Sequence, residues 1–131
     1  MNNIDLMNYW IESSDRDYES MQKNFETNQY TWALFIGHLT LEKLLKALYA
    51  KLNPNNPYPP KIHNLNILAE KCNIELDDKK TRILMTCNSF NISARYEDYK
   101  NEFYERCTET YTSEQIKNIK EIRTWLKEML M

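Results

Sequence analysis

Two amines, a carboxylate and an imidazole fall within nine residues of one apolar stretch of the sequence. Glu42 and Lys46 stand four residues apart, and His38 precedes Glu42 by four. Side chains at this spacing are neighbours on a helix surface. One interpretation is an intrahelical ion pair beside a buried histidine. With Lys43 on the same turn, the alternative is a pair of cations that bind a phosphate, with Glu42 as the acid that orients them.

A second group of reactive side chains lies in the segment from Ser93 to Tyr99. Arg95 and Tyr96 stand beside the acids Glu97 and Asp98. A guanidinium can bond an oxyanion through two N–H groups and can also stack on an aromatic ring, so the segment suits a planar anion or a nucleobase. In that interpretation Asp98 is an orienting acid. The alternative is a surface arginine paired with one of the two carboxylates.

His63 is the third candidate, because it follows a proline-rich stretch and precedes a short apolar pattern. It could cap a helix or anchor the loop. It could equally join the cations as a ligand-binding group. The functional hypothesis is therefore that several segments converge on one site, with a ligand-binding set of Lys43, Lys46, His63, Arg95 and Tyr96.

The composition argues against several other kinds of site. The chain has one glycine, which leaves no glycine-rich phosphate loop. Three cysteines at wide spacing (Cys72, Cys87 and Cys107) fit neither a disulfide framework nor a zinc site, so we expect reduced thiols and no metal or other cofactor. A formal net charge of -2 argues against tight nonspecific binding of nucleic acid.

No apolar run approaches the ~18 residues of a spanning helix, and the N-terminal residues do not resemble a signal peptide. We therefore expect a cytoplasmic protein with no membrane contact.

Helices are the elements that must position these groups, because one glycine and four prolines confined to residues 53–61 leave few turns for hairpins. Residues 1–131 are predicted to form one all-α domain, an up-and-down antiparallel bundle of about five helices. The predicted helices cover about 7–25, 30–52, 63–72, 77–90 and 112–130, the last beginning with a Thr112–Gln115 capping box. Residues 91–111 are aromatic but weakly patterned, and are predicted as part loop and part helix.

The order of these motifs resembles the HEPN domain of bacteria and archaea. The resemblance is carried by AxFxxxxxxEKLLKAL from Ala33 to Leu48, the proline-rich loop, HxL at His63, and ARYED from Ala94. It implies a helical up-and-down bundle that is usually a homodimer. It also implies a nucleotidyltransferase-type partner, because such proteins are often encoded beside a minimal nucleotidyltransferase, and some of these pairs act as toxin and antitoxin.

Ribonucleases of that family carry an arginine followed, after four to six intervening residues, by a histidine. Here the corresponding positions hold Lys100, Asn101 and Glu102, and no histidine follows His63. We therefore assign no catalytic residue and predict a protein that binds a nucleotide or a nucleic-acid phosphate as the partner of a nucleotidyltransferase. Two alternatives stay open: a divergent ribonuclease in which His63, or Tyr96 and Tyr99, replaces the missing histidine, and a helical adaptor whose exposed aromatic residues serve self-association.

Overall fold

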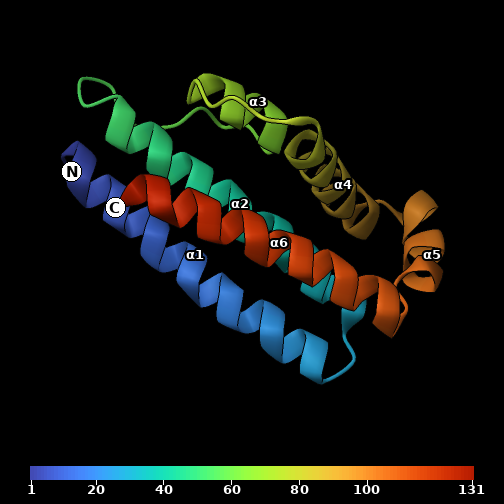
Figure 1. The fold of residues 1–131 in the computed structure, drawn as a ribbon. Helices are drawn as coiled ribbons and strands as arrows, with labels where there is room; N and C mark the ends of the chain where they lie inside the picture. Colours follow the sequence, from blue (N-terminus) through green and yellow to red (C-terminus); the bar gives the residue numbers. More distant parts are fainter.

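The computed structural model describes residues 1–131 as six α-helices without a β-strand (Figure 1). The all-α class is therefore confirmed. The helices are α1 (Asn3–Glu26), α2 (Tyr30–Leu52), α3 (Leu65–Lys71), α4 (Asp78–Arg95), α5 (Glu97–Arg106) and α6 (Glu109–Leu130).

Four long helices form the bundle. In Figure 1, α1 and α4 run in one direction and α2 and α6 run in the other, so that the two chain termini lie at the same end. The short helix α3 lies beside α2 and α4, and α5 closes the end opposite the termini. Helix α2 contacts all five other helices. It is therefore the element from which side chains reach most of the molecule.

The central place of α2 follows from its sequence, which is apolar around most of its circumference. Its leucines Leu34, Leu41, Leu44 and Leu45 are fully or almost fully buried. Gly37, the one glycine of the chain, lies where side chains of α1 and α6 pack against the α2 backbone. A Cβ atom at Gly37 would lie 2.6 Å from Ile119 Cδ1 and 3.2 Å from Met21 Sδ.

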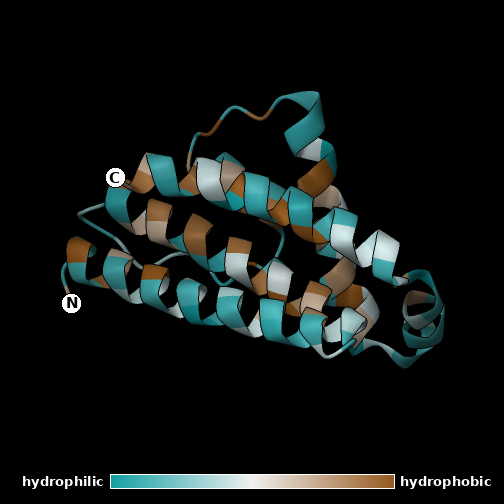
Figure 2. Cartoon of the chain, turned by 60° about the horizontal axis from the view of Figure 1, so that its bottom comes forward, coloured by the Kyte–Doolittle hydropathy of each residue, from teal (hydrophilic) through white to brown (hydrophobic).

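The structure corrects the sequence prediction between residues 90 and 112. Helix α4 continues beyond Phe90 to Arg95, and the weakly patterned segment forms α5. Helix α5 is mostly hydrophilic (Figure 2) and buries only Phe103, which explains its faint apolar pattern. The bundle therefore has six helices where about five were expected.

The predicted start of the last helix is wrong by one turn. Thr108 caps α6, because its hydroxyl accepts a hydrogen bond from the Tyr111 backbone N–H at 3.1 Å. Thr112 is instead fully buried within the helix. Two threonines four residues apart both satisfy the local rule for a cap, and the earlier one extends the helix by another turn.

Candidate functional site

Glu42 lies at the centre of a polar cluster in the apolar interior. The residue is 5% exposed, and its Oε2 accepts a hydrogen bond from Lys46 Nζ at 3.1 Å. Its Oε1 accepts a hydrogen bond from His63 Nδ1 at 3.0 Å. A buried carboxylate is costly unless its charge is compensated, and Lys46, one turn further along α2, supplies that charge. The predicted intrahelical ion pair is therefore confirmed.

His38, one turn before Glu42, is completely buried. Its Nε2 lies 2.8 Å from the backbone carbonyl oxygen of His63, and its Nδ1 lies 3.2 Å from Asn91 Nδ2. A carbonyl can only accept and an amide nitrogen can only donate, so these partners assign His38 the neutral Nε2–H tautomer. Burial lowers the pKa of His38 below its ordinary value of 6.5, against the opposing effect of the Glu42 charge.

His63 differs from His38 in that its side chain is 59% exposed. Its Nδ1–H donates to Glu42, and its backbone carbonyl is held by His38. The ring is therefore fixed at one edge, and its second nitrogen, Nε2, makes no hydrogen bond within the chain. Asn64, the next residue, caps α3 by accepting a hydrogen bond from the Ile67 backbone N–H at 3.1 Å. These contacts fix the loop end that carries the imidazole.

A small cavity of about 110 Å³ lies beside the two histidines. Three asparagines and a single apolar side chain complete its wall, which consists of His38, His63, Asn64, Asn88, Asn91 and Ile92. Asn88 uses its amide to hold the start of α3, accepting from the Leu65 backbone N–H at 2.8 Å and donating to Asn66 Oδ1 at 2.9 Å. Asn91 is bonded only to His38, so it keeps one N–H and its carbonyl oxygen for a ligand.

Lys43 and Lys46 are not presented together to solvent. Lys43 Nζ lies 2.5 Å from Asp17 Oδ2 on α1, whereas Lys46 is held by Glu42 and lies 5.4 Å from the centre of the Trp10 ring. None of the five principal cavities is lined by Lys43, Lys46 or Arg95. None of these five cavities therefore brings the three cations together.

Arg95 ends α4 and is exposed, and its Cζ lies 5.5 Å from the centre of the Phe35 ring. It forms no ion pair with Glu97 or Asp98, because Glu97 pairs with Lys100 at 3.0 Å and Asp98 has no partner. The interpretation of Arg95 as a paired surface arginine is therefore wrong. Its charge is close enough to contribute to the lowered pKa of His38, after burial as the main cause. Tyr96, at the junction of α4 and α5, is exposed beside it.

Sequence reasoning missed Asn88 and Asn91. They stand three residues apart on the α4 segment that also carries the buried residues Cys87 and Phe90. A polar side chain at an inward position needs a partner, so their place in this pattern was the available signal. No group of three or more His, Cys, Asp or Glu side chains lies close enough together to hold a metal ion.

Comparison with known proteins decides the family. The model of the HEPN domain matches residues 7–129, which run from α1 to the end of α6. The chain belongs to the HEPN family. No curated protein and no solved structure matches this HEPN chain significantly. None of its six helices combines the length and the apolarity that crossing a bilayer requires.

Proposed function

We propose that this HEPN protein binds the ribose-phosphate part of a nucleotide or of RNA beside His63. The observation that carries the proposal is the fixed imidazole. Glu42 holds Nδ1–H at 3.0 Å and leaves the exposed Nε2 without a partner at the edge of an asparagine-lined cavity. An unpaired imidazole nitrogen accepts a hydrogen bond, and a ribose hydroxyl is a suitable donor.

The phosphate would be bound by the donors nearby. Asn91 keeps one free N–H, and Arg95 carries a guanidinium with no carboxylate partner. Charge-assisted hydrogen bonds from a guanidinium to phosphate are among the stronger polar contacts in proteins. Tyr96, next to Arg95, stays a predicted contact, and Asp98 stays a predicted orienting acid.

Lys43 and Lys46 have a different place in this proposal. Both ammonium groups face carboxylates within the chain, so a phosphate would have to compete with Asp17 or Glu42. Their predicted role as direct ligands stays untested. We propose that Lys46 acts through Glu42, whose charge it compensates, and so positions the His63 ring.

Calorimetric titration tests the binding directly. Wild-type protein is titrated with ribose 5-phosphate, AMP, ATP and a short single-stranded RNA. Arg95→Ala should weaken binding at least about tenfold, because a hydrogen bond to a charged group contributes roughly 1.5–3 kcal/mol. Arg82→Ala is the matched control, because Arg82 is an exposed arginine without an ion pair on the same helix. No heat with any of the four ligands would reject the proposal.

We also propose the assembly that the family resemblance implies, a homodimer that docks a nucleotidyltransferase in a two-protein, toxin–antitoxin-like module. Exposed apolar side chains along α4 and α5 support a partner surface: Met85, Ile92, Tyr96 and Tyr99. Isolated exposed residues are normal, but four along neighbouring helices favour an interface. Light scattering that gives a strict monomer at every concentration would contradict the dimer.

RNA cleavage is the second candidate function, and the Glu42–His63 pair is the observation that favours it. A carboxylate that fixes Nδ1–H leaves Nε2 as a base, which could accept the proton of a ribose 2′-hydroxyl. Tyr96 and Tyr99 are weaker candidates, because a phenol hydroxyl is a poorer proton acceptor than an imidazole nitrogen. Incubation of total RNA with wild-type protein and with His63→Ala is the test. Intact RNA with the wild-type protein would reject a nuclease.

A further inference from the structure

A second, larger cavity of about 410 Å³ lies between the start of α2 and the α4–α5 corner. We call it the Trp32 pocket. Its wall includes Trp32, Ala94, Lys100, Asn101, Phe103 and Tyr104. The Trp32 pocket shares no lining residue with the small cavity beside His38 and His63. Its volume lies within the usual range for small-molecule sites.

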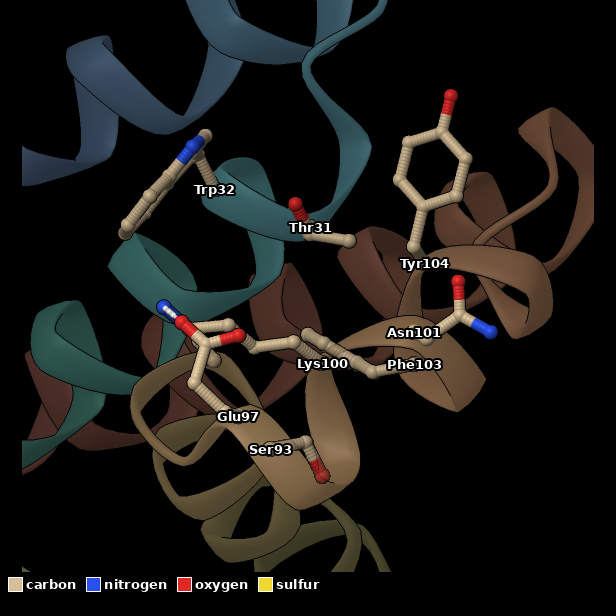
Figure 3. Close-up of a pocket in the computed structure, with 9 residues that line it drawn as sticks. Thr31, Trp32, Ser93, Glu97, Lys100, Asn101, Phe103 and Tyr104 are labelled. Atoms are coloured by element: carbon tan, nitrogen blue, oxygen red, sulfur yellow. Dashed lines mark hydrogen bonds and ion pairs between the residues drawn. The ribbon is translucent and has the colours of Figure 1, made fainter.

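Aromatic rings flank this pocket. Trp32 is 48% exposed and Tyr104 is 73% exposed, although large aromatic side chains are usually more buried. Figure 3 shows the two rings on opposite sides of Thr31, both open to the space above α5. The indole packs against Phe35 in an edge-to-face contact, with ring centres 5.8 Å apart and planes at 80°. One face of Trp32 is therefore available to a planar ligand.

The rest of the pocket supplies hydrogen-bonding groups that the chain itself does not use. Asn101, Ser93 and Thr31 line the cavity, and none of their side chains makes a hydrogen bond within the protein. These hydroxyl and amide groups can both donate and accept hydrogen bonds, as the polar edge of a nucleobase requires. Lys100 lies alongside, paired with Glu97 at 3.0 Å (Figure 3).

The pocket and Arg95 are joined by a row of aromatic contacts. The Trp32 ring centre lies 5.8 Å from Phe35, and Arg95 Cζ lies 5.5 Å from the same ring. The indole and the guanidinium are therefore at most about 11 Å apart. A nucleotide whose base lies on Trp32 could reach Arg95 with its phosphate groups.

From this arrangement we infer that the Trp32 pocket holds one unpaired nucleobase, stacked on the exposed ring of Trp32. The inference rests on the proposed phosphate contact with Arg95, and it adds a position for a base within reach of that contact. The base can come from a free nucleotide or from single-stranded RNA. A paired base in a duplex cannot enter, because its edge and faces are occupied.

Calorimetry with ligands that carry or lack the base tests the inference. Adenosine, AMP, ribose 5-phosphate, a ten-residue single-stranded adenylate RNA and a duplex RNA are titrated against wild type, Trp32→Ala and Trp32→Phe. AMP should bind wild type on the order of tenfold more tightly than ribose 5-phosphate, because stacking on an aromatic side chain favours the base. Trp32→Ala should remove this difference and leave the ribose 5-phosphate affinity unchanged, and Trp32→Phe should keep part of it.

Tyr58→Ala is the control, because Tyr58 is an aromatic residue of the proline-rich loop that is 60% exposed. It should bind every ligand as wild type does. Equal affinities of wild type for AMP and ribose 5-phosphate, or a Trp32→Ala variant that keeps the full difference, would overturn the inference. Adenosine separates the two proposals: its binding to wild type and not to Trp32→Ala supports the base pocket even if ribose 5-phosphate fails to bind. Comparison of AMP with the single-stranded RNA identifies the source of the base, and tight duplex binding that needs Trp32 would also contradict the pocket.

Discussion

At the residue scale, Lys43 and Lys46 lie on the same helix but pair with carboxylates of different burial. Lys46 compensates a nearly buried carboxylate, whereas Lys43 pairs with Asp17 where both side chains are more than 20% exposed. Removal of one member of a buried pair leaves an uncompensated charge, and removal of one member of a half-buried pair that water still reaches costs less. The two residues therefore form a natural pair of test variants.

We predict that Lys46→Met lowers the free energy of unfolding by about 3 kcal/mol, and that Lys43→Met lowers it by about 1 kcal/mol or less. Urea unfolding followed by circular dichroism measures both values. Equal losses for the two variants would show that the Glu42 environment is not the buried one described here.

His38 gives a pH dependence whose sign follows from its burial. Burial lowers the pKa of His38 below 6.5 in the folded state. At a pH between the folded-state pKa and the unfolded-state pKa, the unfolded chain binds a proton that the folded chain does not. The stability contributed by neutral His38 is then lost as the pH falls below about 6.5. The free energy of unfolding should fall by up to about 1.4 kcal/mol per pH unit more than in His38→Gln. Unfolding curves at pH 7.5, 6.5 and 5.5 measure this, and parallel losses in both proteins would contradict it.

The sequence predicted the contact between Glu42 and Lys46 but not the contact between Glu42 and His63. The i, i+4 spacing predicted the Glu42–Lys46 pair, because that contact lies within one helix. The Glu42–His63 bond joins residues 21 positions apart across the proline-rich loop, and no local rule gives that contact. The same holds for Lys43, whose partner Asp17 is on another helix.

At the scale of elements, the strongly patterned helices were predictable and the α5 region was not. Helix α2 is apolar on most sides, and its bounds, Tyr30 to Leu52, are those predicted. Helix α5 buries one residue, and its start at Glu97 follows directly on the end of α4. Its position depends on Phe103 stacking against Phe90 of α4, with ring centres 5.7 Å apart, which is a tertiary contact.

Gly37 sets the distance between α2 and α6, and its substitution tests that packing. A larger side chain must displace Ile119 and Met21, so Gly37→Leu should destabilise the fold by about 3 kcal/mol. Gly37→Ala should be much closer to neutral, because alanine favours the helix by about 1 kcal/mol and Ile119 Cδ1 is the movable end of a side chain. Combination of Gly37→Leu with Ile119→Ala should recover part of the loss. A Gly37→Leu variant as stable as wild type would contradict the close contact of the helices.

At the scale of the whole molecule, the three thiols report on global unfolding. Burial raises the pKa of Cys87 to about 12 and those of Cys72 and Cys107 to about 11. Because only the thiolate reacts, iodoacetamide at pH 8 should modify all three at least about a hundredfold more slowly than a free cysteine. In urea they should react together. Mass spectrometry measures the modification, and rapid labelling of any one thiol in the folded protein would show that its surroundings are not packed as described.

The packing of the helices also determines which polar side chains come into contact. Glu42 on α2, His63 before α3 and Asn91 on α4 form one cluster because α3 and α4 both pack against α2. The bundle class was predictable from composition and periodicity. The cluster was not, because it depends on how three elements pack together.

The most direct test of the central claim, that Glu42 fixes His63 with Nε2 free for a ligand, is a two-dimensional nitrogen-15 NMR spectrum of the imidazole rings. The chain has only two histidines, and the His38→Gln variant assigns their signals. We predict opposite tautomers at neutral pH, Nε2–H in His38 and Nδ1–H in His63, and a shift of the His63 Nε2 signal when ribose 5-phosphate is added. An Nε2–H tautomer for His63, or an Nε2 signal that ribose 5-phosphate leaves unchanged, would contradict the account.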